Sequence, residues 1–441
     1  MNVKILSWIL LAWISFNTWV DYLQIPGVDF YHYWGVAKAQ QLTPSPLNSP
    51  YIAPDTYANV LNQYAETTED KRLRDANAYR RTLDLTGTPL LYTFFAILPE
   101  NYTRAIVSFR FFQLILFISA ILLIGVLQNC PDNFLMLALV LSATFLPVVM
   151  DLRVGNLNTI QLFLIVISTL LVDRANCHHS RQRLHSGLIA ACLFIFITLL
   201  KPNLILTVLT LSISFLVKYG FPKLTVLIPA SMAFSALIIL LTSVFLGSSQ
   251  VWLDWYALVS NRDRLAYALI AGNYSTPLLI SHHYNLDIYA AVAAVAAFLA
   301  ISLGGVILMS AFKRGLAVGK SFKVVLDIFR DPGLAVSIAM TVTIALSPLV
   351  WVHYYTLLLL PILWTMNPRH YCKKANWLSL LAIASSGGII LQILLSLRIA
   401  LSPELHATNF ILGWVFIWAR ILFIVLDLPD KNPDKTELTA A

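Results

Sequence analysis

The residues best suited to chemistry lie in short polar clusters, each at the end of an apolar stretch. The first cluster, residues 25–34, places an acid, Asp29, among aromatic residues and close to His32. Asp29 could remove a proton from a hydroxyl group, because a positioned carboxylate can act as a general base. It could equally cap a helix or lie in solvent as an ordinary loop acid. His32 could line the same pocket, or simply lie at a membrane interface among its aromatic neighbours.

Three basic side chains in other clusters could bind phosphate. Lys201 follows an apolar run and precedes Pro202, which would end a helix there and aim the side chain. Lys201 is therefore either a snorkelling lysine at a helix end or a contact for a lipid-linked phosphate. Arg153 is a second phosphate candidate, although Asp151 could simply pair with it. His353 is the third, and its alternative is a satisfied core histidine.

Amide side chains accompany these charges. Asn156 and Asn158 follow Gly155 in a short turn between apolar runs, where glycine permits close approach of the backbone. Because an amide both donates and accepts hydrogen bonds, the pair could bind sugar hydroxyls. Ordinary turn chemistry is the alternative. Asn203 and Asn273, in two further clusters, are expected to contribute to the same sugar and acceptor binding.

The elements that carry these clusters must be membrane helices. The chain has 441 residues, of which 58% are hydrophobic and only 12% charged, about half the charged share of a soluble domain. In lipid every backbone polar group must be satisfied internally, and unbroken apolar runs such as residues 224–245 fit helices rather than alternating barrel strands. We therefore expect an all-α polytopic membrane protein, one domain over residues 1–441.

The apolar runs predict about twelve spans, several of them shorter than the roughly twenty residues needed to cross, so broken helices are expected. A long loop, residues 24–104, follows the first span. Asp55 is expected to cap a surface helix over residues 56–81, and residues 88–98 predict a re-entrant or interfacial helix. The predicted spans are residues 5–20, 105–127, 134–150, 159–172, 186–200, 204–217, 224–246, 288–311, 333–350, 354–365, 377–397 and 411–426.

The basic residues of the short loops predict the orientation. Thirteen Lys and Arg residues fall on one side of the predicted spans and five on the other, and the richer side should be cytoplasmic, with both termini. The polar clusters then share the outer side. Ionisable residues at membrane depth are costly and need a partner or a function. Five clusters on one face predict a single polar cavity that opens outward.

Several functional classes lack their sequence signatures. The chain has no phosphate-binding loop of an ATP-driven pump and no hydrolase motif. It has no Asp-x-Asp pair to hold a metal-bound nucleotide sugar, so we expect no metal and no cofactor. The four cysteines lack metal-ligand spacing and predict unpaired thiols. The net charge of +8 indicates loops facing a membrane surface, not nucleic-acid binding.

Five motifs resemble those of glycosyltransferase family 87, the polyprenol-phosphate-mannose-dependent mannosyltransferases of the GT-C class. They are Val28-Asp-Phe-x-x-Tyr-x-x-x-Ala37, Gly155-Asn-Leu-Asn158, Lys201-Pro202, Gly272-Asn-Tyr-Ser275 and Ser347-Pro-Leu-Val-Trp-x-His353, in the family's order. Asn156 and Tyr274 stand where the family usually has glutamine.

The resemblance implies an inverting transfer of a mannose-like hexose from a polyprenyl phosphate, in the cell membrane, to a glycolipid or glycan. Asp29 would be the base, and Lys201, His353 and Arg153 would stabilise the departing lipid phosphate. Two other functions stay open: a transporter or flippase of a lipid-linked sugar or polyol, and a structural membrane subunit. The concentration of polar residues on one side counts against a transporter, which needs polar gates on both.

Overall fold

The computed structural model describes residues 13, 16–21, 24–43, 47–83, 85–128, 131–174, 180–220, 224–261, 272–366, 375–390, 393 and 402–428. Over these residues the chain is helical, and its one β-type contact is an isolated bridge between Asn273 and Trp351. The predicted all-α class is confirmed. Most of the predicted first span, residues 5–20, lies outside the described residues, as do three of the four cysteines.

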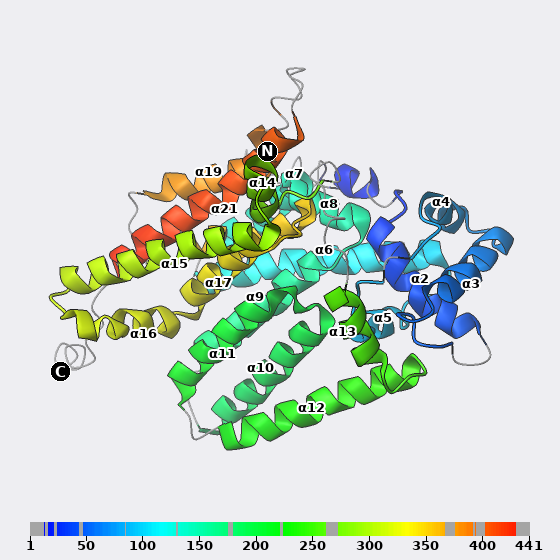
Figure 1. Cartoon of the computed structure of the whole chain (residues 1–441), viewed down its shortest axis with the longest axis horizontal. Coiled ribbons are helices and arrows are strands. Elements are labelled where there is room, and N and C mark those ends of the chain that lie inside the picture. Colours follow the sequence, from blue (N-terminus) through cyan, green and yellow to red (C-terminus); the bar gives the residue numbers. More distant parts are fainter. Residues whose placement is uncertain are drawn as a thin grey trace, which may run out of the picture.

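Figure 1 shows how the helices are arranged in space. The first half comprises α2 (Val28–Leu42), α3 (Pro54–Thr67), α4 (Lys71–Tyr79), α5 (Pro89–Phe95), α6 (Tyr102–Leu127), α7 (Pro131–Thr144), α8 (Leu146–Val154), α9 (Asn158–Asp173), α10 (Ser180–Leu200) and the 3-10 turn η2 (Pro202–Leu204). The second half comprises α11 (Ile205–Tyr219), α12 (Leu224–Phe245), α13 (Val251–Asn261), α14 (Thr276–Tyr284), α15 (Ile288–Lys313), η6 (Val318–Lys320), α16 (Phe322–Arg330), α17 (Pro332–Leu346), η7 (Val352–Leu358), α18 (Leu359–Thr365), α19 (Asn376–Ser386) and α21 (Pro403–Leu426).

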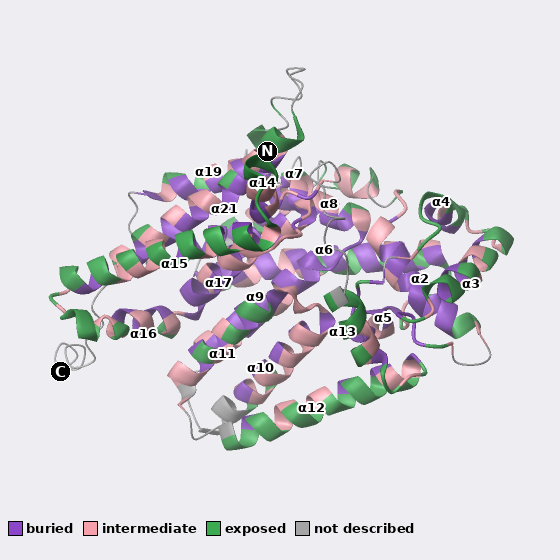
Figure 2. Ribbon diagram, viewed as in Figure 1, coloured by how far each residue is buried: buried purple, intermediate pink, exposed green. Residues whose placement is uncertain are grey.

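Four of the described helices, α6, α12, α15 and α21, are long and apolar enough to cross a membrane, and the number rises to six if two bent helix pairs each count as one span. The predicted number of about twelve is not confirmed. Several predicted spans, α9 among them, form apolar helices of only 10–17 residues. α12 and α15 expose most of their surface (Figure 2), which suits helices at a lipid-facing edge.

The two bent pairs are broken at prolines. α7 and α8 bend by 64° at a break where Pro147 stands in the first turn of α8. η6–α16 and α17 bend by 94° at Pro332. Proline has no backbone N–H and its ring clashes with the preceding turn, so a helix does not run through it undisturbed. The single span predicted over residues 134–150 is therefore two helices at an angle.

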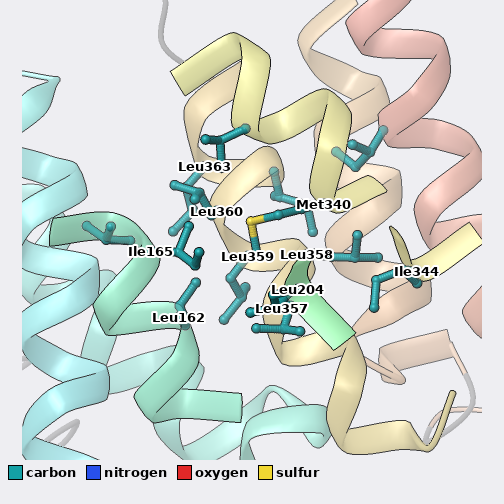
Figure 3. Packing of buried hydrophobic residues seen from close by; sticks show 14 of the residues in the cluster. Leu162, Ile165, Leu204, Met340, Ile344, Leu357, Leu358, Leu359, Leu360 and Leu363 are labelled. Atoms are coloured by element: carbon teal, nitrogen blue, oxygen red, sulfur yellow. The ribbon is translucent and has the colours of Figure 1, made fainter. Parts of the chain in front are cut away.

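The core lies where α9, α17, η7 and α18 meet (Figure 3). Leu162 and Ile165 of α9 pack there with Met340 of α17 and with the leucine run 357–360, and all of these side chains are at most 1% exposed. This packing fixes η7, and with it His353, against α9.

Charged residues pair at helix ends away from the polar clusters. Lys218 at the end of α11 binds Asp173 at the end of α9, at 2.9 Å. Lys313 at the end of α15 pairs with Asp427, just after α21. Both lysines belong to the basic set predicted to face the cytoplasm. The pairs bring these four helix ends together two by two.

The long loop differs from expectation in one respect. Residues 56–81 do not form one helix capped by Asp55. α3 begins at Pro54, whose fixed φ suits a first helical position, so Asp55 falls inside the first turn. Asp70 breaks the stretch by capping α4, where its carboxylate accepts from two backbone N–H groups, and it also binds the backbone N–H and hydroxyl of Thr103, both at 2.8 Å. Burial raises the pKa of Asp70, but these hydrogen bonds outweigh it and the net pKa lies below the ordinary value.

Candidate active site

Asp29 lies in the first turn of α2, and that turn is pressed against α6 and α8. The Tyr102 hydroxyl donates to the Gly27 carbonyl at 3.1 Å. A Cβ added at Gly27 would come within 2.7 Å of Ile106 and 3.1 Å of the Val154 carbonyl. Only glycine fits this approach, so the residue type at position 27 sets how closely Asp29 reaches the bundle.

The turn between α8 and α9 meets α2 at a second close contact. Gly155 ends α8 in the left-handed conformation, with φ of 71°, where other residues are strained. A Cβ there would lie 2.6 Å from the Phe30 Cβ. The turn can therefore bring Asn156 directly beside the first turn of α2.

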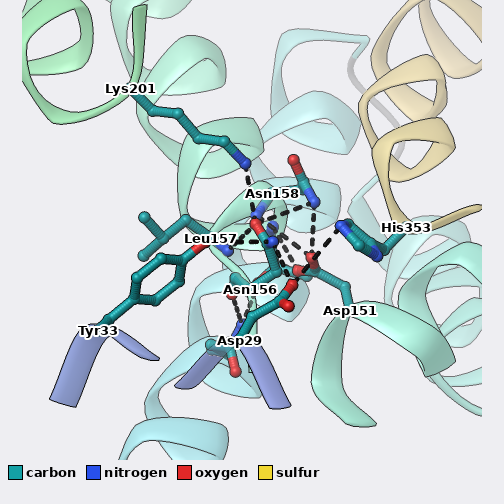
Figure 4. Close-up of polar contacts among 10 residues, drawn as sticks. Asp29, Tyr33, Asp151, Asn156, Leu157, Asn158, Lys201 and His353 are labelled. Carbon is teal, nitrogen blue, oxygen red and sulfur yellow. Dashed lines mark hydrogen bonds and ion pairs between the residues drawn. The ribbon is translucent and has the colours of Figure 1, made fainter. Parts of the chain in front are cut away.

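Asn156 joins two charged groups that are far apart in the sequence (Figure 4). Its Nδ2 donates to Asp29 Oδ2 at 2.6 Å, and its Oδ1 accepts from Lys201 Nζ at 2.9 Å. The same oxygen accepts from the Leu157 backbone N–H at 2.6 Å. Asn156 is 3% exposed, and its amide is used to hold these protein groups in place rather than left open to a sugar.

Asp151 is the buried anchor of this turn. It is fully buried, and its carboxylate accepts from Asn158 Nδ2 at 2.8 Å, from the Asn158 backbone N–H at 3.3 Å and from the Thr159 backbone N–H at 2.9 Å. The suggested pairing of Asp151 with Arg153 is wrong. The carboxylate instead satisfies the free N–H groups at the start of α9, where a helix terminus favours negative charge.

Lys201 and His353 complete the cluster from two other elements. Lys201 lies between α10 and η2, and its ammonium group sits 4.5 Å from the centre of the Tyr354 ring. It also interacts electrostatically with both Asp151 and Asp29. His353 Nε2 lies 3.8 Å from Asp29 Oδ2, is buried and has no hydrogen-bond partner. The Asp29 carboxylate, the Lys201 ammonium and the His353 imidazole thus lie in one cluster around Asn156.

Asp29 and Lys201 are the half-buried members of this group, whereas Asn156 and His353 are buried. The Asp29 side chain is 27% exposed, against 9% for that of His353. The predicted gathering of Asp29, Asn156, Lys201 and His353 in one place is therefore observed. Each comes from a different stretch of chain: α2, the α8–α9 turn, the α10–η2 joint and η7.

Three of the predicted amides lie differently. Asn158 is fully buried and held by Asp151. Asn203 accepts from Gln161 Nε2 at 2.8 Å. Asn273 is fully buried, where it binds the Pro348 carbonyl and the Val350 N–H at 3.0 and 2.7 Å. Asn158 thus binds the Asp151 side chain, and Asn273 holds the backbone.

Arg153 and His32 lie outside the contact cluster. The Arg153 side chain is exposed and lines a cavity of about 450 Å³ with Val28, and only its carbonyl makes a hydrogen bond, from Arg110 at 2.6 Å. His32 is buried and lines a second cavity, of about 400 Å³. His32 is three residues after Asp29 on α2, so the two share one face of the helix.

Three groups at the site were missed. The Tyr33 hydroxyl lies 3.5 Å from Asn156 Nδ2, and Tyr354 lies under the Lys201 ammonium. Gln113, fully buried in apolar α6, donates to the Asn156 carbonyl and, at 3.3 Å, to Thr159 Oγ1. A lone amide within a 26-residue apolar helix is the signal that could have revealed Gln113, because such a group needs a partner.

Among the described residues, no three His, Cys, Asp or Glu side chains are grouped so as to hold a metal ion. Comparison of the chain with protein-family models, curated proteins and solved structures found no match in any of the three. The geometry of the cluster and the motifs of the sequence are therefore the features that point to a function.

Proposed function

We propose that this chain is an integral-membrane glycosyltransferase that moves a mannose-like hexose from a polyprenyl-phosphate donor to a hydroxyl group of a glycolipid or glycan acceptor, on the extracytoplasmic face. One observation carries the proposal: the partly exposed Asp29 carboxylate shares a single cluster with Lys201 and His353, and Asn156 holds it there. The sequence resemblance to the GT-C mannosyltransferases supports the same chemistry.

Asp29 acts as the general base. Its carboxylate takes the proton of the acceptor hydroxyl, and the oxygen attacks the anomeric carbon of the donor sugar from the face opposite the phosphate. The bond between that carbon and the phosphate oxygen breaks, and the polyprenyl phosphate leaves with the electron pair. The anomeric configuration is inverted. The hydrogen bond from Asn156 fixes which way the carboxylate points.

Lys201 and His353 stabilise the leaving phosphate. Preorganised donors aimed at a developing negative charge lower the barrier without reorganising during the reaction. Lys201 offers an ammonium held by one hydrogen bond and one aromatic ring. His353 offers a buried ring nitrogen, Nε2, which has no hydrogen-bond partner among the described residues and lies 3.8 Å from Asp29 Oδ2.

An apolar cavity supports a lipid donor. It has a volume of about 650 Å³, lies between α10, α11 and α12, and is lined by Thr198 and Ile205 among many apolar residues. Thr198 precedes Lys201 by three residues at the end of α10, and Ile205, four residues after Lys201, begins α11. A prenyl tail in this cavity would end near the ammonium that binds its phosphate.

The test uses purified protein in lipid nanodiscs, a polyprenyl-phosphate hexose and an alkyl glycoside acceptor. The wild type should release polyprenyl phosphate, and Asp29→Asn should lower kcat by about 10²–10⁴-fold, the range for loss of a general base. Asp55→Asn, an exposed acid in α3, is the matched control and should keep full activity. Normal turnover by Asp29→Asn with an unchanged melting temperature would overturn the base assignment.

A flippase is the second candidate, favoured by the two helix pairs bent by 64° and 94°, since transporters use broken helices. A fluorescent polyprenyl-phosphate sugar in liposomes separates the two. A flippase moves it between leaflets and leaves it intact, whereas a transferase consumes it only when an acceptor is present.

A further inference from the structure

The face of α2 that carries Asp29 borders two cavities that share one arginine. The first, of about 450 Å³, is lined by Val28 and Arg153, and the second, of about 400 Å³, by His32. Arg80 lines both. Val28, Asp29 and His32 fall on one side of α2, because residues three and four apart are neighbours on a helix. The two cavities therefore run beside the proposed base, with Arg80 at their junction.

The wall that carries Arg80 is rigid. Arg80 directly follows α4, and α4 is tied down at both ends. Asp70 at its start binds the first turn of α6. Asn77 near its end accepts from the Tyr31 hydroxyl of α2 at 2.6 Å, in a buried bond, and burial raises the pKa of Tyr31 above its ordinary value. Because α4 is held in this way, the backbone that carries Arg80 needs little ordering at binding.

The charges of the two cavities are mainly positive. Their charged lining side chains are Arg80, Arg153 and one acid, Asp75. Neither arginine has an ion-pair partner among the residues that the structure describes, and Arg80 lies over the exposed Tyr79 ring at 5.7 Å. Arginine binds phosphate and carboxylate groups with two parallel hydrogen bonds. Each cavity has a volume in the range of small-molecule sites.

We infer that these two cavities form the acceptor site of the proposed transferase, and that the acceptor carries an anionic group, which Arg80 and Arg153 bind. The inference rests on the proposed function and adds the class of acceptor. The anion is a phosphate of a glycolipid or the carboxylate of an acidic sugar. The acceptor glycan lies along α2, with its reacting hydroxyl at Asp29 and its anion at Arg80 and Arg153.

The experiment compares three acceptors of equal alkyl chain: a neutral glycoside, one with a phosphodiester and one with a uronic acid. We expect a lower KM for one or both anionic acceptors than for the neutral one. Arg80→Gln and Arg153→Gln should each raise that KM by about 10-fold or more, as expected for a lost charge-assisted contact, and should raise it by a larger factor than the KM of the neutral acceptor. A lower KM for the phosphodiester would indicate a glycolipid phosphate, and a lower KM for the uronic acid would indicate an acidic sugar.

Arg81→Gln is the matched control, since Arg81 is adjacent and exposed but lines neither cavity. Equal KM values for all three acceptors in the wild type, or equal losses in Arg80→Gln and Arg81→Gln, would overturn the inference. Binding of the fluorescent anionic acceptors is measured alongside, without donor. If the protein never consumes the donor but Arg80→Gln binds the anionic acceptors more weakly, the proposed transferase function is refuted and the anion site stands. If the protein consumes the donor but shows no preference for anionic acceptors, the anion site is refuted and the transferase function stands.

Discussion

Replacing Asn156 by leucine tests the cluster most directly. Leucine is close in size but can neither donate nor accept a hydrogen bond, so both links of Asn156 to charged groups would be lost. Asp29 would lose the donor at 2.6 Å and Lys201 the acceptor at 2.9 Å. Asn156 is a positioning residue in this scheme, because its amide acts through Asp29 and Lys201.

The magnitude follows from these two bonds. A hydrogen bond to a charged group contributes about 1.5–3 kcal/mol, and each 1.36 kcal/mol is tenfold in rate. If only the bond to Asp29 differs in value between ground and transition state, kcat/KM should fall by about 10–100-fold. A fall well beyond this range would indicate that Lys201 has also moved.

The assay is release of polyprenyl phosphate as a function of pH. A hydrogen bond donated to a carboxylate favours its ionised form, so its loss should move the acidic limb of the kcat/KM profile to higher pH. A purely structural defect would lower the whole profile and leave its shape unchanged.

Asn409→Leu is the control, since Asn409 is a half-buried amide of α21 that donates to the Ser385 carbonyl at 2.9 Å and to none of the site residues. It should keep the wild-type pH profile. An Asn156→Leu enzyme with a normal rate and profile would refute the argument that this amide positions the base.

Two further predictions concern stability, measured as the thermal midpoint in detergent. Asp70→Ala should cost about 1 kcal/mol of stability, because it removes a helix cap. Folding lowers the pKa of Asp70, so the stabilisation by Asp70 should be present above about pH 4 and be lost as the pH falls through the folded pKa, and the variant should lack this loss. Equal acid sensitivity of variant and wild type would contradict this. Gly155→Ala should cost about 2 kcal/mol of stability or more, because φ of Gly155 is 71° and the new Cβ would lie 2.6 Å from the Cβ of Phe30. Gly304→Ala in α15 is the control. A Cβ there meets no atom within 4 Å, so this variant should be neutral or stabilising.

The sequence allowed the apolar helices to be predicted, and the reason is physical. A long apolar run such as α6 or α15 satisfies its own backbone and needs no partner to be recognised. Breaks were harder to place. Pro147 and Pro332 stand where the helices bend, but the residues around each proline do not determine the bend angle or which helices pack against the bend.

The site was predicted as a set of polar groups at helix ends, and four of them are in contact. What the sequence could not supply is the use made of each amide. Asn156 lies 127 residues from Asp29, and the packing of Gly155 on Phe30 and of Gly27 on Ile106 brings them together. The same applies to Asp151, whose nearest charged neighbour in the chain is Arg153 but whose partners are the first N–H groups of α9.

Hydrogen bonds join the segment before α14 to the turn before η7. Asn273 binds Pro348 and Val350, the Tyr274 N–H donates to the Val350 carbonyl at 2.8 Å, and Ser275 Oγ donates to the Ser347 carbonyl at 2.8 Å. These hydrogen bonds join two stretches that are separated by some seventy residues, and His353 follows soon after the second stretch. Because His353 follows Val350 by only three residues, a shift of the segment before α14 would also shift the imidazole that faces Asp29.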